Sequence, residues 1–230
     1  MKVSFVIPAR DERETLPSAV SSVSSQEGEF DKELIVVDGG SSDGTLSYAR
    51  EVADKVVTGV KGRGNARDTG ARQSSGDYIV FLDADTELRP SFTSTAIEMM
   101  EEKELSACTA KFEMTGLRSR VVQFICNQVL MRGQTPLLPG FAVAVKTGDY
   151  LESGGFSDVL GEDLEFSSTI ESVGDSGVIR KKLVRTSGRR IASMGLTGTL
   201  VYYSLKELGR RRGVRESRIK DIRQSLTLSI

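Results

Sequence analysis

One stretch of the sequence decides the fold, YIVFLDAD at residues 78–85. The run Tyr78–Leu82 is apolar or aromatic throughout and predicts a buried strand, and two carboxylates, Asp83 and Asp85, follow where that strand ends. Parallel sheets bind ligands at the carboxyl ends of their strands. Mg²⁺ and Mn²⁺ prefer oxygen ligands, and Mg²⁺ is usually held by one or two carboxylates together with substrate phosphates. A metal-bound diphosphate substrate is therefore expected here, although a bare Asp-x-Asp is more often a solvated loop.

Strands and helices alternate on both sides of this stretch, which predicts an α/β fold with a mainly parallel central sheet flanked by helices. Before it, the expected strands are 3–7, 33–37 and 55–58, and the expected helices are 14–24, 45–53 and 65–74. Pro90 predicts the first position of a helix that runs to about 103. Beyond it, the expected strands are 105–114, 141–145 and 177–184, and the expected helices are 119–131, 164–172 and 196–209.

Composition excludes several classes of protein. A chain of 230 residues fits one large domain, or one domain with a small appendage. It contains no histidine, which excludes a Ser-His-Asp triad, a Cys-His pair and a His-ligated zinc, and leaves proton transfer to carboxylates, lysines, tyrosines or a metal-bound oxygen. Cys108 and Cys126 are far apart and indicate a reducing compartment. With no signal peptide pattern and no long apolar run, a cytoplasmic location is expected.

Charge is distributed unevenly along the chain. Residues 180–230 hold 14 basic and 3 acidic residues, a net charge of +11, whereas the remainder holds 17 basic and 29 acidic residues, a net of −12. The run 200–205, LVYYSL, followed by Arg210-Arg211-Arg212, reads as an amphipathic helix with a basic end. Such a segment predicts contact with phosphates at an anionic membrane surface, with the inner face of the cell membrane as the expected place; a solvated basic helix is the alternative.

Five motifs in this order resemble glycosyltransferase family 2 proteins of the GT-A fold, over roughly residues 3–172. They are VIPARDE at 6–12, VVDGGSSDGT at 36–45, GNARDTG at 64–70, FLDAD at 81–85, and GGF at 154–156 followed by GED at 161–163. The DGGS form and SGRR at 187–190 are similar to short, soluble bacterial and archaeal members. The chain departs from the family at Asp11, Gly39 and Asp68, and it has no Trp and no Gln-x-x-Arg-Trp motif, so transfer of a single sugar is expected rather than polymerisation.

The resemblance implies a set of residues that bind the nucleotide. Pro8, Ala9 and Glu12 would surround the base and ribose, and Arg67 would lie near the diphosphate, where a guanidinium suits phosphate geometry. An ion pair of Arg67 with Asp68 or Asp77 on the surface is the alternative. Asp38 would accept an N–H of the base, since Asp43 is expected to cap the next helix and so leaves Asp38 free. Asp83 would contact the ribose or a metal-bound water. Arg189 and Arg190 would bind the diphosphate or an acceptor phosphate.

The resemblance also implies the metal and the base. Asp85 would ligate Mg²⁺ or Mn²⁺ directly, with Asp83 assisting, and the metal would neutralise the departing nucleoside diphosphate. Asp163 would be the general base and Glu162 would assist it or bind the acceptor, because both stand at a helix N-terminus whose dipole keeps a carboxylate ionised. The alternative is that Glu162 and Asp163 are ordinary acids of a first helical turn.

The sequence therefore predicts a metal-dependent, inverting glycosyltransferase that uses a UDP- or GDP-linked sugar and an acceptor hydroxyl or a polyprenyl-phosphate or other lipid-linked acceptor. Its domain would span 1–195, with a nucleotide-binding half at about 1–88, an acceptor half at about 89–195, and a basic helical extension at 196–230. One alternative is a sugar-nucleotide pyrophosphorylase, which the absence of a Gly-rich loop after Arg10 disfavours. The other is a nucleic-acid-binding module at 206–223, which is disfavoured because no aromatic residue follows Tyr203.

Overall fold

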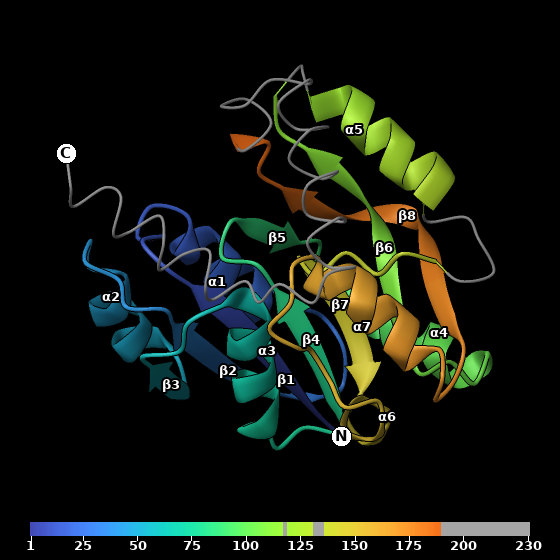
Figure 1. Cartoon of the computed structure of the whole chain (residues 1–230), viewed down its shortest axis with the longest axis horizontal. Helices are drawn as coiled ribbons and strands as arrows, with labels where there is room; N and C mark the ends of the chain where they lie inside the picture. The colour runs from blue at the N-terminus through green and yellow to red at the C-terminus, as the bar shows by residue number, and fades with distance from the viewer. Residues whose placement is uncertain (117–118, 131–135, 190–230) are drawn as a thin grey trace.

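The computed structural model describes residues 1–116, 119–130 and 136–189. Within them one eight-stranded sheet has the order β3-β2-β1-β4-β7-β6-β8-β5 and is flanked by helices (Figure 1). Its strands are β1 (Lys2–Ala9), β2 (Asp31–Asp38), β3 (Lys55–Thr58), β4 (Tyr78–Leu82), β5 (Thr86–Leu88), β6 (Ala107–Met114), β7 (Ala142–Lys146) and β8 (Ser176–Thr186). The helices are α1 (Leu16–Ser24), α2 (Thr45–Val52), α3 (Arg63–Arg72), α4 (Phe92–Glu102), α5 (Ser119–Ile125), a π-helix (Cys126–Leu130), α6 (Thr147–Glu152) and α7 (Glu162–Ile170).

The first four strands are parallel, as the sequence predicts. β1 pairs with β2 and β4, and β2 pairs with β3. The register places Ala9 beside Asp38 and Asp38 beside Thr58, so the ends of β1, β2 and β3 lie in one row. The loops that follow these strands therefore meet at a single edge of the sheet, which is where α/β proteins bind ligands.

The second half of the sheet is mixed rather than parallel. β7 is antiparallel to both β4 and β6, and β5 is antiparallel to β8, whereas β6 and β8 are parallel. The sequence did not predict β5 or α6, because elements of three and six residues are too short to show a period. The helix expected at Pro90 begins at Phe92 instead, because the N–H of Arg89 bonds to Leu183 of β8 and extends the strand pairing to that residue.

Two apolar layers hold the helices on the sheet. Alternate residues of β1 point to opposite faces, so Phe5 packs with α1 and α4 while Val6 packs with α3 and α7. The second layer contains three aromatic rings around Phe81, those of Tyr150, Phe156 and Phe166, with Phe156 and Phe166 stacked at a centroid distance of 4.2 Å. α3 approaches the sheet closely at Gly70, where a Cβ atom would lie 2.3 Å from Val6 Cγ1. This close approach brings Arg67, which lies on α3, toward the carboxyl end of β4.

Some of the sequence predictions are not tested by this architecture. The boundary near residue 88 stays a prediction, and the helix at 196–209 and the extension at 196–230 lie outside the described residues. In the part of the chain that the structure describes, no helix is long and apolar enough to cross a membrane.

A buried carboxylate joins β1, β2 and β3 at the edge of the sheet opposite to the loops just described. Glu33 is 4% exposed and accepts hydrogen bonds from Ser4 Oγ and from the N–H of Ser75. The ammonium of Lys55 lies 2.9 Å from its Oε1. Burial alone would raise the pKa of Glu33, but these hydrogen bonds outweigh burial and lower the pKa from 4.5 to about 2. The ionised form of Glu33 therefore stabilises the fold.

We predict that Glu33→Gln lowers the free energy of unfolding at pH 7 by about 3 kcal/mol, because a carboxyl pKa that is lowered on folding stabilises the protein fully above the unfolded pKa and progressively less as pH falls toward the folded pKa. The difference from wild type should fall to about half by pH 3 as the wild-type carboxylate takes up its proton in the unfolded state. Urea unfolding from pH 7 to pH 3 measures it, with Glu51→Gln on the exposed side of α2 as the control. A difference that does not change with pH would contradict this role.

Candidate active site

A cleft of about 250 Å³ lies where the loops after β1, β2, β3 and β4 meet. Five of the predicted site residues, three from the nucleotide set and both carboxylates of the Asp-x-Asp, line this one cleft. Its lining comprises Pro8, Ala9, Arg10, Glu12, Val37, Gly39, Val60, Lys61, Gly62, Arg63, Ala66, Asp83, Ala84 and Asp85. The sheet register therefore brings together side chains that are up to 77 positions apart in the sequence.

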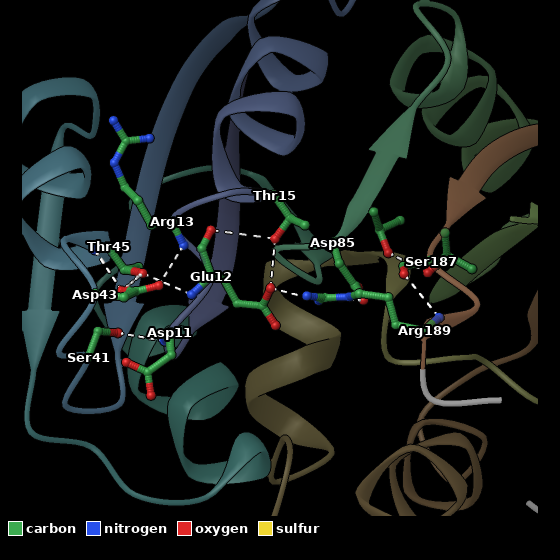
Figure 2. Close-up of polar contacts among 12 residues, drawn as sticks. Asp11, Glu12, Arg13, Thr15, Ser41, Asp43, Thr45, Asp85, Ser187 and Arg189 are labelled. Carbon is green, nitrogen blue, oxygen red and sulfur yellow. Dashed lines mark hydrogen bonds and ion pairs between the residues drawn. The ribbon is translucent and has the colours of Figure 1, made fainter. Parts of the chain in front are cut away.

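Hydrogen bonds between the loops after β1 and β2 hold Glu12 in place (Figure 2). The backbone N–H groups of Asp11, Glu12 and Arg13 donate to side-chain oxygens of Ser41, Thr45 and Asp43, in that order. Asp11 adopts a φ of 51°, a left-handed conformation that Asp and Asn tolerate better than most residues. These bonds make the Glu12 turn part of a two-loop framework.

Asp38, at the end of β2, is only partly satisfied by this framework. It is 1% exposed, and its Oδ2 accepts the N–H groups of Gly40 and Ser41. Its Oδ1 is buried and has no hydrogen-bond partner among the described residues. Asp43 binds the N–H of Thr45 at the start of α2, although the N-cap position belongs to Gly44 rather than to Asp43 or Ser42. Asp38 therefore keeps one acceptor beside Gly39, which lines the cleft.

Arg67 of α3 is placed differently from both sequence interpretations. Its side chain is 1% exposed, its Nη2 lies 2.6 Å from Asp83 Oδ1, and its Nη1 lies 3.2 Å from Glu162 Oε1. The surface pair with Asp68 or Asp77 is wrong, since Asp68 pairs with Arg72 and Asp77 accepts the N–H of Lys2. Arg67 is also not among the described residues that line the cleft; it lies behind the Asp83 carboxylate.

The surroundings of Arg67 keep it charged and fixed. Burial alone would lower the pKa of this guanidinium, but the charges of Asp83 and Glu162 outweigh burial and raise the pKa. Its guanidinium carbon lies 5.2 Å from the ring centroid of Phe156. A Cβ atom at Gly140 would come within 2.9 Å of the same group, so the segment before β7 must have a glycine there. Arg67 therefore bridges the loop after β4 to the start of α7.

Asp85 belongs to a second cluster, with Glu12 and Arg189 (Figure 2). Arg189 Nη2 lies 2.7 Å from Glu12 Oε2 and 3.1 Å from Asp85 Oδ2. Burial raises the pKa of Asp85, the neighbouring Asp83 raises it further, and the hydrogen bond from Arg189 offsets part of the rise. Arg189 thus pairs with two residues that line the cleft, while its contact with a phosphate stays a prediction and Arg190 lies outside the described residues.

The donor set at this edge of the cleft suits Mg²⁺ or Mn²⁺. Asp85 and Asp83 offer carboxylate oxygens, and the raised pKa of Asp85 indicates that added positive charge would be favourable there. In the described parts of the chain, no group of three or more His, Cys, Asp or Glu is arranged to hold a metal. Mg²⁺ characteristically takes one or two carboxylates and completes its shell with substrate phosphates and water, a requirement that Asp83 and Asp85 meet.

Glu162 and Asp163 begin α7, as predicted, but they differ in their surroundings. Glu162 is 2% exposed and pairs with both Arg63 and Arg67, so it is held inside the protein. Asp163 is half-buried, and its Oδ1 accepts the N–H of Leu164 in the first turn of the helix. Of these two acids, Asp163 is therefore the more accessible, although neither is among the described residues that line the cleft.

The sequence interpretation missed three cationic side chains of the cleft: Arg10, Lys61 and Arg63. Lys61 and Arg63 follow β3 in the segment 59–64, GVKGRG. The signal that identifies them is their position, since basic residues that follow a strand of a parallel sheet lie at its ligand-binding edge.

A family model described as Glycosyl transferase family 2 matches residues 4–142. This match covers more than half of the chain and contains β1 to β6 together with both carboxylates of the Asp-x-Asp. The chain belongs to glycosyl transferase family 2, a family of glycosyltransferases.

Curated relatives of this chain include enzymes whose names specify polyprenyl-linked acceptors. The UDP-Glc:alpha-D-GlcNAc-diphosphoundecaprenol beta-1,3-glucosyltransferase of Escherichia coli is 31% identical over 131 residues, which cover 55% of this chain and 51% of that protein. The dolichol-phosphate mannosyltransferase of Pyrococcus furiosus is 34% identical over 107 residues, 44% of this chain and 30% of that protein. The chain thus spans about half or less of the length of these relatives.

Solved structures show the same fold, that of GT-A glycosyltransferases. A mannosyltransferase of Pyrobaculum calidifontis in complex with GDP-Man and Mn²⁺ superposes with a TM-score of 0.70 at 20% identity and covers 91% of this chain and 62% of that one. Residues 1–349 of TarS from S. aureus in complex with UDP-GlcNAc superpose with a TM-score of 0.66 at 19% identity, over 82% of this chain and 59% of that one. At these identities the likeness establishes the fold.

We predict that Arg67→Met lowers the free energy of unfolding at pH 7 by about 3–5 kcal/mol, because it removes one partner of a buried ion pair and leaves Glu162 and Asp83 undercompensated. Arg72→Met is the matched control: its side chain is 56% exposed and pairs with Asp68 one turn away. That exposed pair should contribute only about 0.3–0.5 kcal/mol. Urea unfolding of both variants measures the difference, and equal losses would show that the bridge through Arg67 contributes no special stability.

Proposed function

We propose that this protein transfers a single sugar from a nucleotide-sugar donor to an acceptor with inversion at the anomeric carbon, and that it requires Mg²⁺ or Mn²⁺. The observation that carries the proposal is the cleft itself, in which nucleotide-binding, cationic and carboxylate side chains meet at the ends of parallel strands. The family assignment favours this transferase over a sugar-nucleotide pyrophosphorylase. Donors linked to UDP or GDP are both supported, since structural neighbours hold UDP-GlcNAc and GDP-Man.

The donor's parts match different sides of the cleft. Pro8, Ala9 and Glu12 would surround the base and ribose, and the orphan Oδ1 of Asp38 would accept the ring N–H of uracil or guanine. Lys61 and Arg63 bring positive charge to the wall formed by the loop after β3, where they would meet the diphosphate.

Asp85, assisted by Asp83, would hold the metal, which would act as a Lewis acid toward the leaving nucleoside diphosphate. In the ligand-free protein, Arg189 supplies positive charge to Asp85 and Glu12. When a metal and a diphosphate are bound, the same guanidinium would turn from these carboxylates to the phosphates. Arg189 would thereby close over the donor at the side of the cleft away from Lys61.

The proton step falls to Asp163. The acceptor oxygen would form its bond to the anomeric carbon as the bond to the diphosphate breaks on the opposite face, and Asp163 would take the acceptor's proton. Glu162 would hold the start of α7 in place through Arg67, which also binds Asp83. Because the protein forms no covalent intermediate, a single displacement inverts the anomeric centre. The named activities of the relatives support a lipid-linked acceptor.

We predict that Asp85→Asn weakens the binding of a nucleoside diphosphate at least tenfold in the presence of Mn²⁺. Loss of a group that only supports a metal ligand typically lowers metal affinity about tenfold or more, and loss of the ligand itself should cost no less. Calorimetric titration of UDP and of GDP, each with Mn²⁺ and with EDTA, measures this effect. Asp31→Asn, at the exposed start of β2, is the control. Unchanged affinity in Asp85→Asn would remove Asp85 as a ligand and, with it, the proposed metal site.

We predict that Asp163→Asn lowers turnover about 10²–10⁴-fold, or about 3–5 kcal/mol of barrier, while leaving donor affinity within about twofold of wild type. The amide has nearly the same size as the carboxylate but cannot accept the proton. Turnover is measured with the UDP- or GDP-sugar that binds, against polyprenyl-phosphate and sugar-diphosphate-lipid acceptors, and the anomer of the product is read by NMR. Near wild-type turnover would place the base elsewhere, and retention of configuration would refute the single displacement.

A further inference from the structure

Helix α5 has its polar and apolar faces reversed relative to an ordinary surface helix. Its inward side is polar: Gln123 Oε1 accepts the N–H of Met114, and the Asn127 side chain in the following π-helix pairs with both the N–H and the C=O of Phe112. These amides satisfy the part of β6 that extends beyond its pairing with β7. A helix on the surface of a globular protein normally turns its apolar stripe toward the core, so the outward face of α5 is the unusual one.

That outward face is apolar. Val121, Phe124 and Ile125 are 50%, 65% and 42% exposed, and their spacing of three and four residues puts them on one side of the helix. They are three of the six large apolar side chains that are exposed in the described residues. Figure 1 shows α5 at the outside of the molecule beside β6, at the far end from α2 and β3. With these exposed fractions, the face is open to the surroundings of the protein.

A basic groove runs beside the apolar face. The groove has a volume of about 650 Å³ and lies between α5, the π-helix and strands β6 and β8. Lys111, Arg120, Arg180 and Lys182 line it, against a single acid, Glu113, whose carboxylate is within 3.5 Å of Lys182 and 3.7 Å of Arg89. Positive charge beside exposed aromatic and aliphatic side chains is the pattern of a surface that lies in the interface of an anionic bilayer.

We propose that the outward face of α5 and the adjacent basic groove dock this protein on a membrane with anionic headgroups. Phe124, Val121 and Ile125 would enter the boundary between headgroups and acyl chains, and the four basic side chains would meet lipid phosphates. A second copy of the chain is a poorer occupant, because a symmetric contact would bring two basic grooves together. The site includes no residue after 189 and none of the residues that line the catalytic cleft, so it stands independently of the proposed reaction.

The test is co-sedimentation of the full chain with vesicles of phosphatidylcholine and of phosphatidylcholine with 30 mol% phosphatidylglycerol, about the composition of an anionic leaflet. Wild type should bind the anionic vesicles and release them as salt is raised. The double variant Val121→Ser/Phe124→Ser should bind the anionic vesicles at least about tenfold more weakly, since two apolar side chains no longer enter the bilayer. Leu151→Ser, at an exposed apolar residue of α6, is the matched control and should bind as wild type does.

The charge is tested by a second pair of variants. Lys111→Gln/Arg180→Gln should lose about tenfold or more in affinity for anionic vesicles, because each basic residue near such a surface strengthens binding about fivefold. Arg50→Gln/Lys103→Gln removes two exposed charges elsewhere and should change little. Thermal melts and UDP affinity with Mn²⁺ should match wild type in all four, which separates a docking defect from a folding or donor-site defect.

Three results would overturn the proposal. One is that wild type fails to bind the anionic vesicles. Another is that the Val121→Ser/Phe124→Ser variant of α5 and the Lys111→Gln/Arg180→Gln variant of the groove both bind them as wild type does, which would assign membrane contact to the rest of the chain. The third is that Val121→Ser/Phe124→Ser converts a dimer to a monomer by light scattering while vesicle binding is unchanged, which would make this face a contact between copies.

Discussion

The guanidinium of Arg67 is the interaction on which the rest of the site depends. It joins Asp83, at the end of β4, to Glu162, at the start of α7, and the side chains of Arg67 and Glu162 are almost fully buried. A buried charge of this kind is stable only with its partners in place, so the loop that carries the Asp-x-Asp and the helix that carries Asp163 cannot move independently. The Asp-x-Asp and the start of α7 are thereby held in one fixed relation, which the proposed metal site and the proposed base would need for catalysis by positioning.

The sheet supplies the second constraint. Because β1, β2 and β3 are parallel and end in register, their loops open at one edge and form a cleft without any dedicated binding element. The antiparallel strand β7 lies on the other side of β4, where Gly140, just before it, leaves room for the Arg67 guanidinium. The mixed half of the sheet therefore supports the site from behind, while the parallel half provides the binding surface.

Charge balance at Asp85 links the ligand-free protein to its proposed complex. The protein brings Glu12, Asp83 and Asp85 to the same wall of the cleft and meets their charge with Arg189 on one side and Arg67 on the other. Burial and the neighbouring carboxylate still raise the pKa of Asp85, so this arrangement favours an additional cation. A metal that binds together with a diphosphate would bring positive and negative charge to the cleft at the same time. Arg189 is more exposed than Arg67, so in the proposed complex it is Arg189 that would exchange its carboxylate partners for phosphates.

The sequence by itself determined the parallel α/β half, five of the residues that line the cleft and the position of Asp163 at a helix start, because apolar runs and the polar residues that end them are local signals. Only the tertiary structure decided which charges meet. The partners of Arg67 lie 16 and 95 positions away, and those of Arg189 lie 104 and 177 positions away. No local pattern encodes such separations. The short strand β5, the mixed sheet and the reversed faces of α5 likewise arise from pairing with β8 and β6, since burial and hydrogen-bond satisfaction are settled between elements rather than within them.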